Sequence, residues 1–103
     1  MVPDDHLDLL SLLHYEEHGI VCKEILKSDK NGTSVFSIYR GEGLYCDPSP
    51  ESVLMIGLEG KAEVNYDDRK VVFGTLESVL IPENQHYNLI ALENFKMLSI
   101  RGI

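Results

Sequence analysis

Hydrophobic and polar residues alternate along much of this chain with a period of two, which is typical of half-buried β-strands. The clearest case is the segment KAEVNYD over residues 61–67, in which every second residue is apolar. Elsewhere, short runs of β-branched and aromatic residues are bounded by glycine, proline and asparagine, as strands are. We expect strands over residues 20–26, 33–39, 53–56, 61–67, 71–73, 78–81, 87–92 and 95–100. About eight short strands at this spacing predict an all-β fold, a closed or two-sheet antiparallel barrel.

Turn-forming residues separate the predicted strands. The Asn-Gly pair at 31–32 is a strong hairpin signal, because both residue types tolerate positive φ angles. Pro82 and Asn84 predict a tight turn inside the stretch GTLESVLIPENQHYNLIAL, and His86 falls where the next strand begins. Residues 45–50 contain two prolines, which cannot donate to a central ladder, so we expect this segment to be irregular.

The N-terminal residues depart from the β pattern. Five leucines fall between residues 7 and 13, after a proline and two aspartates, and acidic residues favour the start of a helix. We therefore expect a short N-terminal helix that ends before Gly19, with leucines covering an open end of the fold or packing on a second subunit. The chain then divides into a helical segment, residues 1–18, and a barrel domain, residues 19–103.

Composition and charge narrow the setting. The 103 residues suffice for one domain, and 17 acidic against 9 basic residues give a net charge of −8, which argues against nucleic acid or an anionic membrane as partner. No apolar run approaches the roughly 20 residues of a membrane-spanning helix, and the N-terminal sequence is acidic where a signal peptide is basic. Cys22 and Cys46 can form one bridge at most, and we expect free thiols in a cytoplasmic protein.

From Gly60 to His86 the sequence resembles the second half of a cupin. The glycine before the alternating strand, the glycine that opens the next motif, an isoleucine–proline pair and the histidine follow in the order of that superfamily. The segment GEGLYCDPSPESVLMIGLEG resembles the first cupin motif in layout. The resemblance covers residues 19–101 and is closest to small single-domain bacterial cupins of the cupin 2 conserved barrel type. It implies a small jelly-roll barrel, commonly a homodimer, and it specifies function poorly.

The resemblance also implies where a metal would bind. Metal-binding cupins take two histidines and a glutamate from the first motif, but here that motif contains no histidine. Asp47 falls where a histidine is usual, and the glutamate position falls near Val53. The second motif is one residue shorter than usual, with Asn84 near the place of the glycine, and a one-residue change can move His86 to the other face of the sheet. His86 and Asp47 are thus the candidate ligands for a divalent metal in a degenerate site.

We expect a small-molecule pocket at the barrel mouth, formed by His86, Asp47, Tyr45, Tyr87 and Glu51. Aromatic residues commonly line such pockets, although tyrosines in strands also serve as ordinary core. His86 is either a metal ligand or a pocket histidine bonded to a carbonyl or carboxylate. With Asp47 it can also form a general base, since a nearby carboxylate raises the basicity of an imidazole.

Two further groups carry potential chemistry. Cys46 is a nucleophile only if a basic group lowers its pKa, and its neighbours Asp47 and Glu51 act in the opposite direction, so an inert cysteine is favoured. His14 and His18 are spaced i, i+4 and can bind zinc from one helix face. No third ligand is evident near them, which favours a solvated helix end.

Three functions remain open from the sequence. The favoured hypothesis is a non-catalytic small-molecule-binding or accessory module with a degenerate metal site. The alternative is a metal-dependent isomerase or dioxygenase acting on a small polar or aromatic substrate, with His86 and Asp47 or Glu51 holding the ion. A third hypothesis is a purely architectural domain that dimerises.

Overall fold

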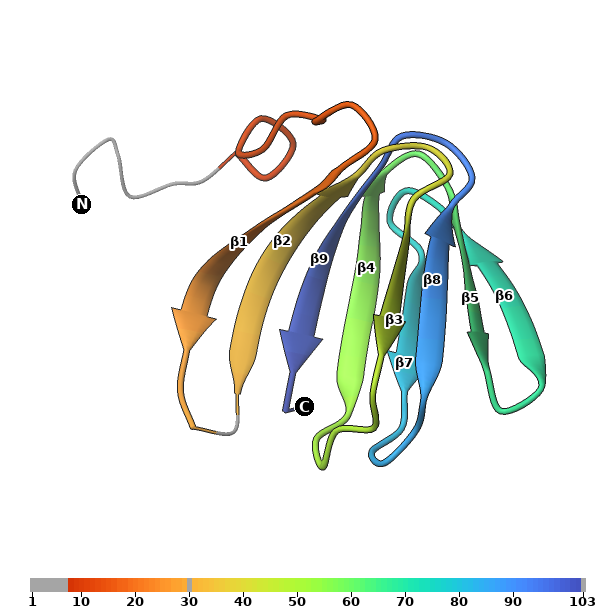
Figure 1. Ribbon diagram of the computed structural model, residues 1–103. Coiled ribbons are helices and arrows are strands. Elements are labelled where there is room, and N and C mark those ends of the chain that lie inside the picture. The colour runs from red at the N-terminus through yellow and green to blue at the C-terminus, as the bar shows by residue number, and fades with distance from the viewer. Residues whose placement is uncertain (1–7, 30, 103) are drawn as a thin grey trace.

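The computed structural model describes residues 8–29 and 31–102, which form nine strands in two antiparallel sheets (Figure 1). The strands are β1 (Ile20–Lys27), β2 (Gly32–Ile38), β3 (Gly43–Cys46), β4 (Val53–Glu59), β5 (Ala62–Tyr66), β6 (Arg69–Phe73), β7 (Ser78–Ile81), β8 (Tyr87–Ala91) and β9 (Phe95–Arg101). Sheet A has the order β1-β2-β9-β4-β7, and sheet B has the order β3-β8-β5-β6. The predicted all-β, two-sheet jelly roll is therefore confirmed.

The two sheets enclose one apolar core between their inner faces. The alternation over residues 61–67 is confirmed, because Ala62 and Val64 are fully buried and Tyr66 packs against the core cluster. Phe73 of β6 and Phe95 of β9 meet edge to face, with ring centroids 5.3 Å apart, and so join the two sheets. Such aromatic pairs stabilise a core beyond the area that they bury.

The strand positions follow the sequence pattern closely, with one addition. The prediction that residues 45–50 are irregular was wrong for Tyr45 and Cys46, which pair with Asn88 and Tyr87 at the end of edge strand β3. Proline restricts only its own ladder position and the residue before it. The two prolines therefore end β3 without preventing it.

Two glycines allow the backbone to pass close to neighbouring segments. A Cβ on Gly57 of β4 would lie 2.0 Å from the carbonyl oxygen of Gly74. Gly60 has a φ of +78°, and a Cβ there would lie 2.1 Å from the carbonyl oxygen of Asn94. Only glycine fits such approaches, because every other residue would place a carbon atom inside the contact distance.

The predicted N-terminal helix is not found in residues 8–18. These residues form a turn at 9–11 and a second turn at 17–18, joined by an irregular segment, while the predicted helix start at residues 1–7 lies outside the described residues. Distant side chains occupy the carbonyls that a helix would use internally: Lys96 Nζ donates to Leu10, and Ser37 Oγ donates to His14 at 2.8 Å. An isolated short helix is marginal in water, so these contacts outweigh it.

The N-terminal segment instead lies across the outer face of sheet A. Besides the bonds to β2 and β9, the Tyr15 hydroxyl donates to Glu59 Oε2 of β4 at 2.6 Å, and Lys96 Nζ lies 5.1 Å from the Tyr15 ring centroid. Leu13 is buried, which confirms that at least this leucine covers part of the fold. Among the described residues, no helix is long and apolar enough to cross a membrane.

Candidate functional site

The connections β1–β2, β3–β4, β5–β6 and β7–β8 and the end of β9 lie at one end of the sandwich (Figure 1). The predicted site residues lie there as well, at the end of β3, in the loop after it and at the start of β8. Left-handed residues shape two of these turns: Asn84 has a φ of 61°, and Asp67 and Asp68 have φ angles of 49° and 60°. The expectation that Asn84 replaces a glycine in a left-handed turn is thus confirmed.

A cavity of about 250 Å³, which we call the inter-sheet cavity, opens at this end. Its wall combines polar and charged side chains with apolar surface. The lining residues are Glu24, Gly32, Ser34, Phe36, Cys46, Asp47, Ser49, Val53, Tyr87, Ser99 and Arg101.

The strand register explains why these residues meet. In sheet A, Arg101 lies opposite both Gly32 and Val53, and Ser99 lies opposite Ser34. Since side chains alternate between faces, Arg101 and Ser99 share the inner face of β9 with Met97 and Phe95 of the core. A Cβ on Gly32 would lie 3.0 Å from Arg101 Nη2, so the glycine leaves room for the guanidinium.

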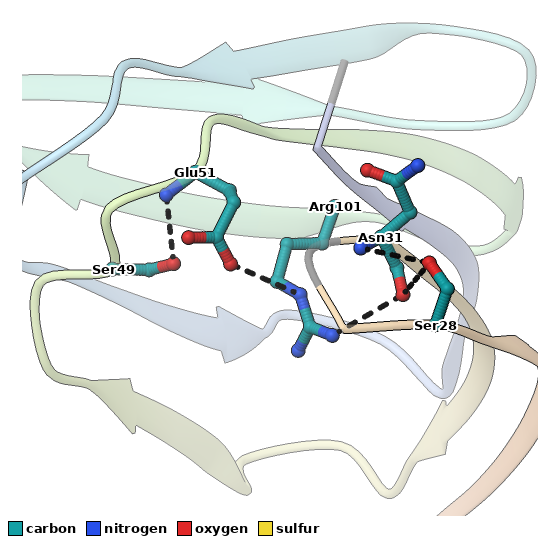
Figure 2. Close-up of polar contacts among 5 residues, drawn as sticks. All are labelled: Ser28, Asn31, Ser49, Glu51 and Arg101. Atoms are coloured by element: carbon teal, nitrogen blue, oxygen red, sulfur yellow. Dashed lines mark hydrogen bonds and ion pairs between the residues drawn. The ribbon is translucent and has the colours of Figure 1, made fainter.

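Arg101 is the central polar group of the cavity (Figure 2). Its Nε lies 3.6 Å from Glu51 Oε1, and its Nη2 donates to the carbonyl oxygen of Asn31 at 3.4 Å. Both contacts are long for charged partners. Within residues 8–29 and 31–102, the buried Nε has no hydrogen-bond partner, although the whole side chain is 39% exposed. The Nε–H donor of the guanidinium is therefore unpaired in the described part of the chain.

The loops hold both partners of Arg101 in place (Figure 2). Asn31 closes the β1–β2 turn, because Ser28 N donates to its carbonyl oxygen at 2.9 Å and its own N–H donates to Ser28 Oγ at 3.2 Å. The N–H of Glu51 donates to Ser49 Oγ at 3.2 Å. These local bonds position one carbonyl and one carboxylate on opposite sides of the guanidinium.

Tyr87 and Cys46 form the wall of the cavity on the side of sheet B. Burial raises the pKa of the Tyr87 phenol above its usual range, and a hydrogen bond with Cys46 adds to the shift. At neutral pH the phenol is therefore protonated. Burial also raises the pKa of the Cys22 thiol on β1, against the lowering effect of a hydrogen bond with Ser34.

Four of the five predicted pocket residues, Tyr45, Asp47, His86 and Tyr87, border one hollow, and Glu51 does not. Asp47 and Tyr87 line the inter-sheet cavity, and Glu51 reaches it through Arg101. Tyr45 and His86 do not line it; they border a second hollow of about 580 Å³, which we call the outer groove. Asp47 and Tyr87 contribute to that groove as well.

The period of strand β8 explains the separation. Leu89 and Ala91 belong to the core and Tyr87 packs against it, so Asn88 lies on the opposite face of sheet B. His86 is exposed and lines the outer groove together with Asn88. A histidine at the position that Tyr87 occupies would lie on the inner face instead. The shorter turn thus accounts for the displacement of the imidazole, as the sequence allowed.

Three polar side chains of the outer groove, those of Asn65, Lys70 and Asn88, have hydrogen-bond or ion-pair partners. Asn65 Nδ2 donates to Asn88 Oδ1 at 3.0 Å and to Glu63 Oε2 at 3.3 Å. Lys70 Nζ pairs with Glu63 Oε1 at 3.8 Å. Tyr45 is 79% exposed on the same row of the sheet, opposite Asn88.

The described donor atoms do not fit a divalent metal. No group of three or more His, Cys, Asp and Glu side chains able to hold an ion occurs in the described ranges. His86 and Asp47 both border the outer groove but belong to no such group there, and Arg101 places a permanent positive charge in the inter-sheet cavity. His14 and His18 are exposed and belong to no such group; the His18 ring lies 5.0 Å from that of Tyr39.

Ser34, Ser99 and Arg101 were not among the predicted site residues. The last strand was predicted to end at Ile100, which excluded the arginine. A signal was present, because Ser99 and Arg101 continue the parity of Phe95 and Met97, so two polar residues extend a buried stripe. Polar residues on an inward-facing stripe often mark a cavity or a site.

No protein-family model matches the chain, and no curated protein sequence does. Solved structures do match. A cupin superfamily protein from Desulfitobacterium hafniense aligns with 98% of this chain and 94% of its own, at 26% identity and a TM-score of 0.91. This chain belongs to the cupin superfamily.

Other solved structures agree with this assignment. A cupin 2 conserved barrel domain protein from Leptotrichia buccalis is 26% identical to this cupin, with a TM-score of 0.89 over 94% of it and 47% of the other chain. A protein of unknown function from Streptococcus pyogenes is 23% identical, with a TM-score of 0.91 over 96% of this cupin and 87% of its own chain. These likenesses identify the fold and name no activity.

Proposed function

We propose that this cupin is a non-catalytic small-molecule-binding module, acting as a sensor or accessory protein, and that its ligand occupies the inter-sheet cavity. The observation that carries the proposal is the guanidinium of Arg101, whose buried Nε lacks a hydrogen-bond partner in the described part of the chain. Buried polar groups are nearly always hydrogen-bonded, and an unpaired one costs about 1–3 kcal/mol. A ligand that completes the bonding of this guanidinium would recover that energy.

The inter-sheet cavity is favoured over the outer groove for two reasons. The two asparagine amides of the groove already pair with each other, and Lys70 pairs with Glu63, so a ligand of these groups would have to compete with internal bonds. The cavity also places Phe36 and Val53 beside hydroxyl and guanidinium groups. A mostly apolar wall with a few convergent polar groups is typical of small-molecule sites.

The alternative, a metal-dependent enzyme, has less support. A catalytic metal needs about three converging protein ligands, and the described donors do not supply them.

We place the protein in the cytoplasm, which the free thiols of Cys22 and Cys46 support, because structural disulfides belong to oxidising compartments.

The binding proposal is tested by ¹H–¹⁵N NMR with a library of small polar metabolites. We expect compounds that bind to shift the amide resonances of Ser34, Tyr87 and Ser99. Arg101→Gln should lower the affinity of these compounds at least about tenfold, since hydrogen bonds to charged groups contribute about 1.5–3 kcal/mol. Arg40→Gln, an exposed arginine that does not line the cavity, is the matched control. Hits that shift only Tyr45, His86 and Asn88, or no hits at all, would contradict the proposal.

We also propose that two copies pair through the outer face of sheet A. On that face Leu54 lies opposite both Leu80 and Ile100, and Ile56 lies opposite Leu98, which makes an apolar patch across three strands. Leu80 is 52% exposed, an unusual state for a large apolar residue within a patch. A second copy would bury this patch symmetrically.

The pairing is tested by light scattering at micromolar concentration. The wild type should give the mass of two chains, and Leu80→Glu should give the mass of one, because the symmetric contact would bury the new charge twice. Leu76→Glu is the control, since Leu76 is 83% exposed in a loop before β7. A monomeric wild type would exclude the proposed dimer.

A further inference from the structure

We infer that the ligand of the inter-sheet cavity is a small organic monocarboxylate whose carboxylate group pairs with Arg101. The inference rests on the proposed function and adds the chemical class and the charge of the ligand. It follows from the underused guanidinium, from a carboxylate that already competes for it, and from the charges around the cavity mouth.

The guanidinium provides the recognition group. Among the described residues that line the cavity, Arg101 is the one cation. Its planar group carries five N–H donors, and it stays charged at every physiological pH. It makes a 3.4 Å hydrogen bond to the carbonyl oxygen of Asn31 and a 3.6 Å ion pair with Glu51. The side chain is 39% exposed, so part of its donor edge is open to a ligand, and a carboxylate matches that edge with two parallel bonds.

Glu51 acts as an internal substitute for the ligand. Its Oε1 lies 3.6 Å from Arg101 Nε, which is beyond hydrogen-bond distance. The Glu51 side chain is 21% exposed. The bond from the Glu51 N–H to Ser49 Oγ restrains the Glu51 main chain. A free carboxylate has no such restraint. It therefore competes with Glu51 for the same charge.

The acidic side chains that line the cavity, which we call the acidic rim, limit the ligand to one negative charge. Glu24 and Asp47 line the cavity, and both residues are exposed. A second carboxylate on the ligand would face these two side chains and Glu51 without a second cation nearby. Like charges placed together across an interface are strongly unfavourable. We therefore expect a dianion to bind at least about tenfold more weakly than a monoanion of similar size.

The remaining surface suits a compact, partly apolar body. Phe36 and Val53 supply the apolar wall, and the hydroxyls of Ser34 and Ser99 lie beside it. The volume of about 250 Å³ equals that of roughly eight water molecules at about 30 Å³ each. A ring or short chain with one carboxylate fits this space, and propionate and benzoate are suitable probes.

The experiment compares charged ligands with neutral ligands of the same shape. Propionate and benzoate are titrated into the ¹⁵N-labelled protein beside propionamide, benzamide and the dianion succinate. We expect the two monocarboxylates to shift the amides of Ser34, Tyr87 and Ser99. The amides should bind at least about tenfold more weakly because they lack the carboxylate that pairs with Arg101, and succinate because its second carboxylate meets Glu24, Asp47 and Glu51.

Three variants separate recognition from a structural role. Arg101→Gln should abolish carboxylate binding, and Arg101→Lys should restore part of it, since lysine keeps the charge without the bidentate geometry. Glu51→Gln should tighten benzoate binding about threefold or more, because it removes the competing charge. A gain in affinity cannot result from misfolding, so this variant keeps the test decisive. Arg40→Gln should leave all affinities unchanged.

The outcomes distinguish this inference from the proposed function. If the neutral amides shift the cavity residues as strongly as the carboxylates do, or if Glu51→Gln weakens binding, the charge assignment is overturned while the binding function stands. If metabolites from the library bind in the cavity but neither monocarboxylate does, the ligand class is likewise overturned. If no compound of either set shifts the cavity residues, the proposed function fails together with the inference.

Discussion

Replacing Gly60 with alanine should lower the free energy of unfolding by about 3–5 kcal/mol. Gly60 has a φ of +78°, a conformation that costs other L-residues about 1–2 kcal/mol. The new Cβ would also lie 2.1 Å from the carbonyl oxygen of Asn94, so the backbone beside the buried Phe95 must move. A domain of this size is stable by only about 5–15 kcal/mol, and the variant should therefore be close to unfolding.

Gly41→Ala is the matched control for this prediction. Gly41 has a φ of +90°, but no atom lies within 4 Å of the position that a Cβ would take. Its replacement should cost only the conformational part, about 1–2 kcal/mol. Urea unfolding followed by circular dichroism measures both losses. Equal losses would show that the close approach to Asn94 contributes nothing.

Phe95→Ala should destabilise the protein by about 3–5 kcal/mol, the usual cost of removing a buried ring and leaving a cavity. Phe95 is fully buried, and its ring meets that of Phe73 at an interplanar angle of 79° with centroids 5.3 Å apart. Since the two rings come from different sheets, the cavity would lie where the sheets pack together. Within the described core cluster, no other pair of aromatic rings is in contact.

Phe95→Leu provides the comparison, because it keeps most of the apolar volume and should cost clearly less than the alanine variant. A double-mutant cycle with Phe73→Leu isolates the edge-to-face contact, for which we expect a coupling of about 0.5–1.5 kcal/mol. Urea unfolding at fixed temperature measures each variant. Purely additive losses would show that the rings contribute only through the area that they bury.

The sheet positions could be predicted because their cause is local. Each strand needs an apolar residue at every second position, and the residues of 61–67 and 78–81 carry that pattern themselves. The left-handed conformation of Asn84 is likewise a property of one residue in one turn. The short edge strand β3 escaped the prediction because proline-rich flanks conceal a pairing that depends on β8.

The N-terminal segment shows where local pattern fails. Its leucines and acids favour a helix, but the bonds that decide its path come from Ser37 and Lys96, which are 23 and 86 residues away from the carbonyls they contact. Four of the five predicted pocket residues meet at the outer groove, but which of them also reach the inter-sheet cavity was decided by the tertiary structure. Tyr87 and His86 are neighbours in sequence, yet one lines the inter-sheet cavity and the other does not, because the turn at Asn84 sets the register of β8.

By itself, the sequence determined which residues form strands, where most turns fall and which superfamily the chain resembles, since all three depend on order along the chain. Only the tertiary structure decided which polar side chains meet. Arg101 contacts Asn31 across 70 residues, and Glu51 reaches the same guanidinium from a third segment. The pairing of sheet A brings these groups together, and a contact between distant segments leaves no period or motif that a sequence can display.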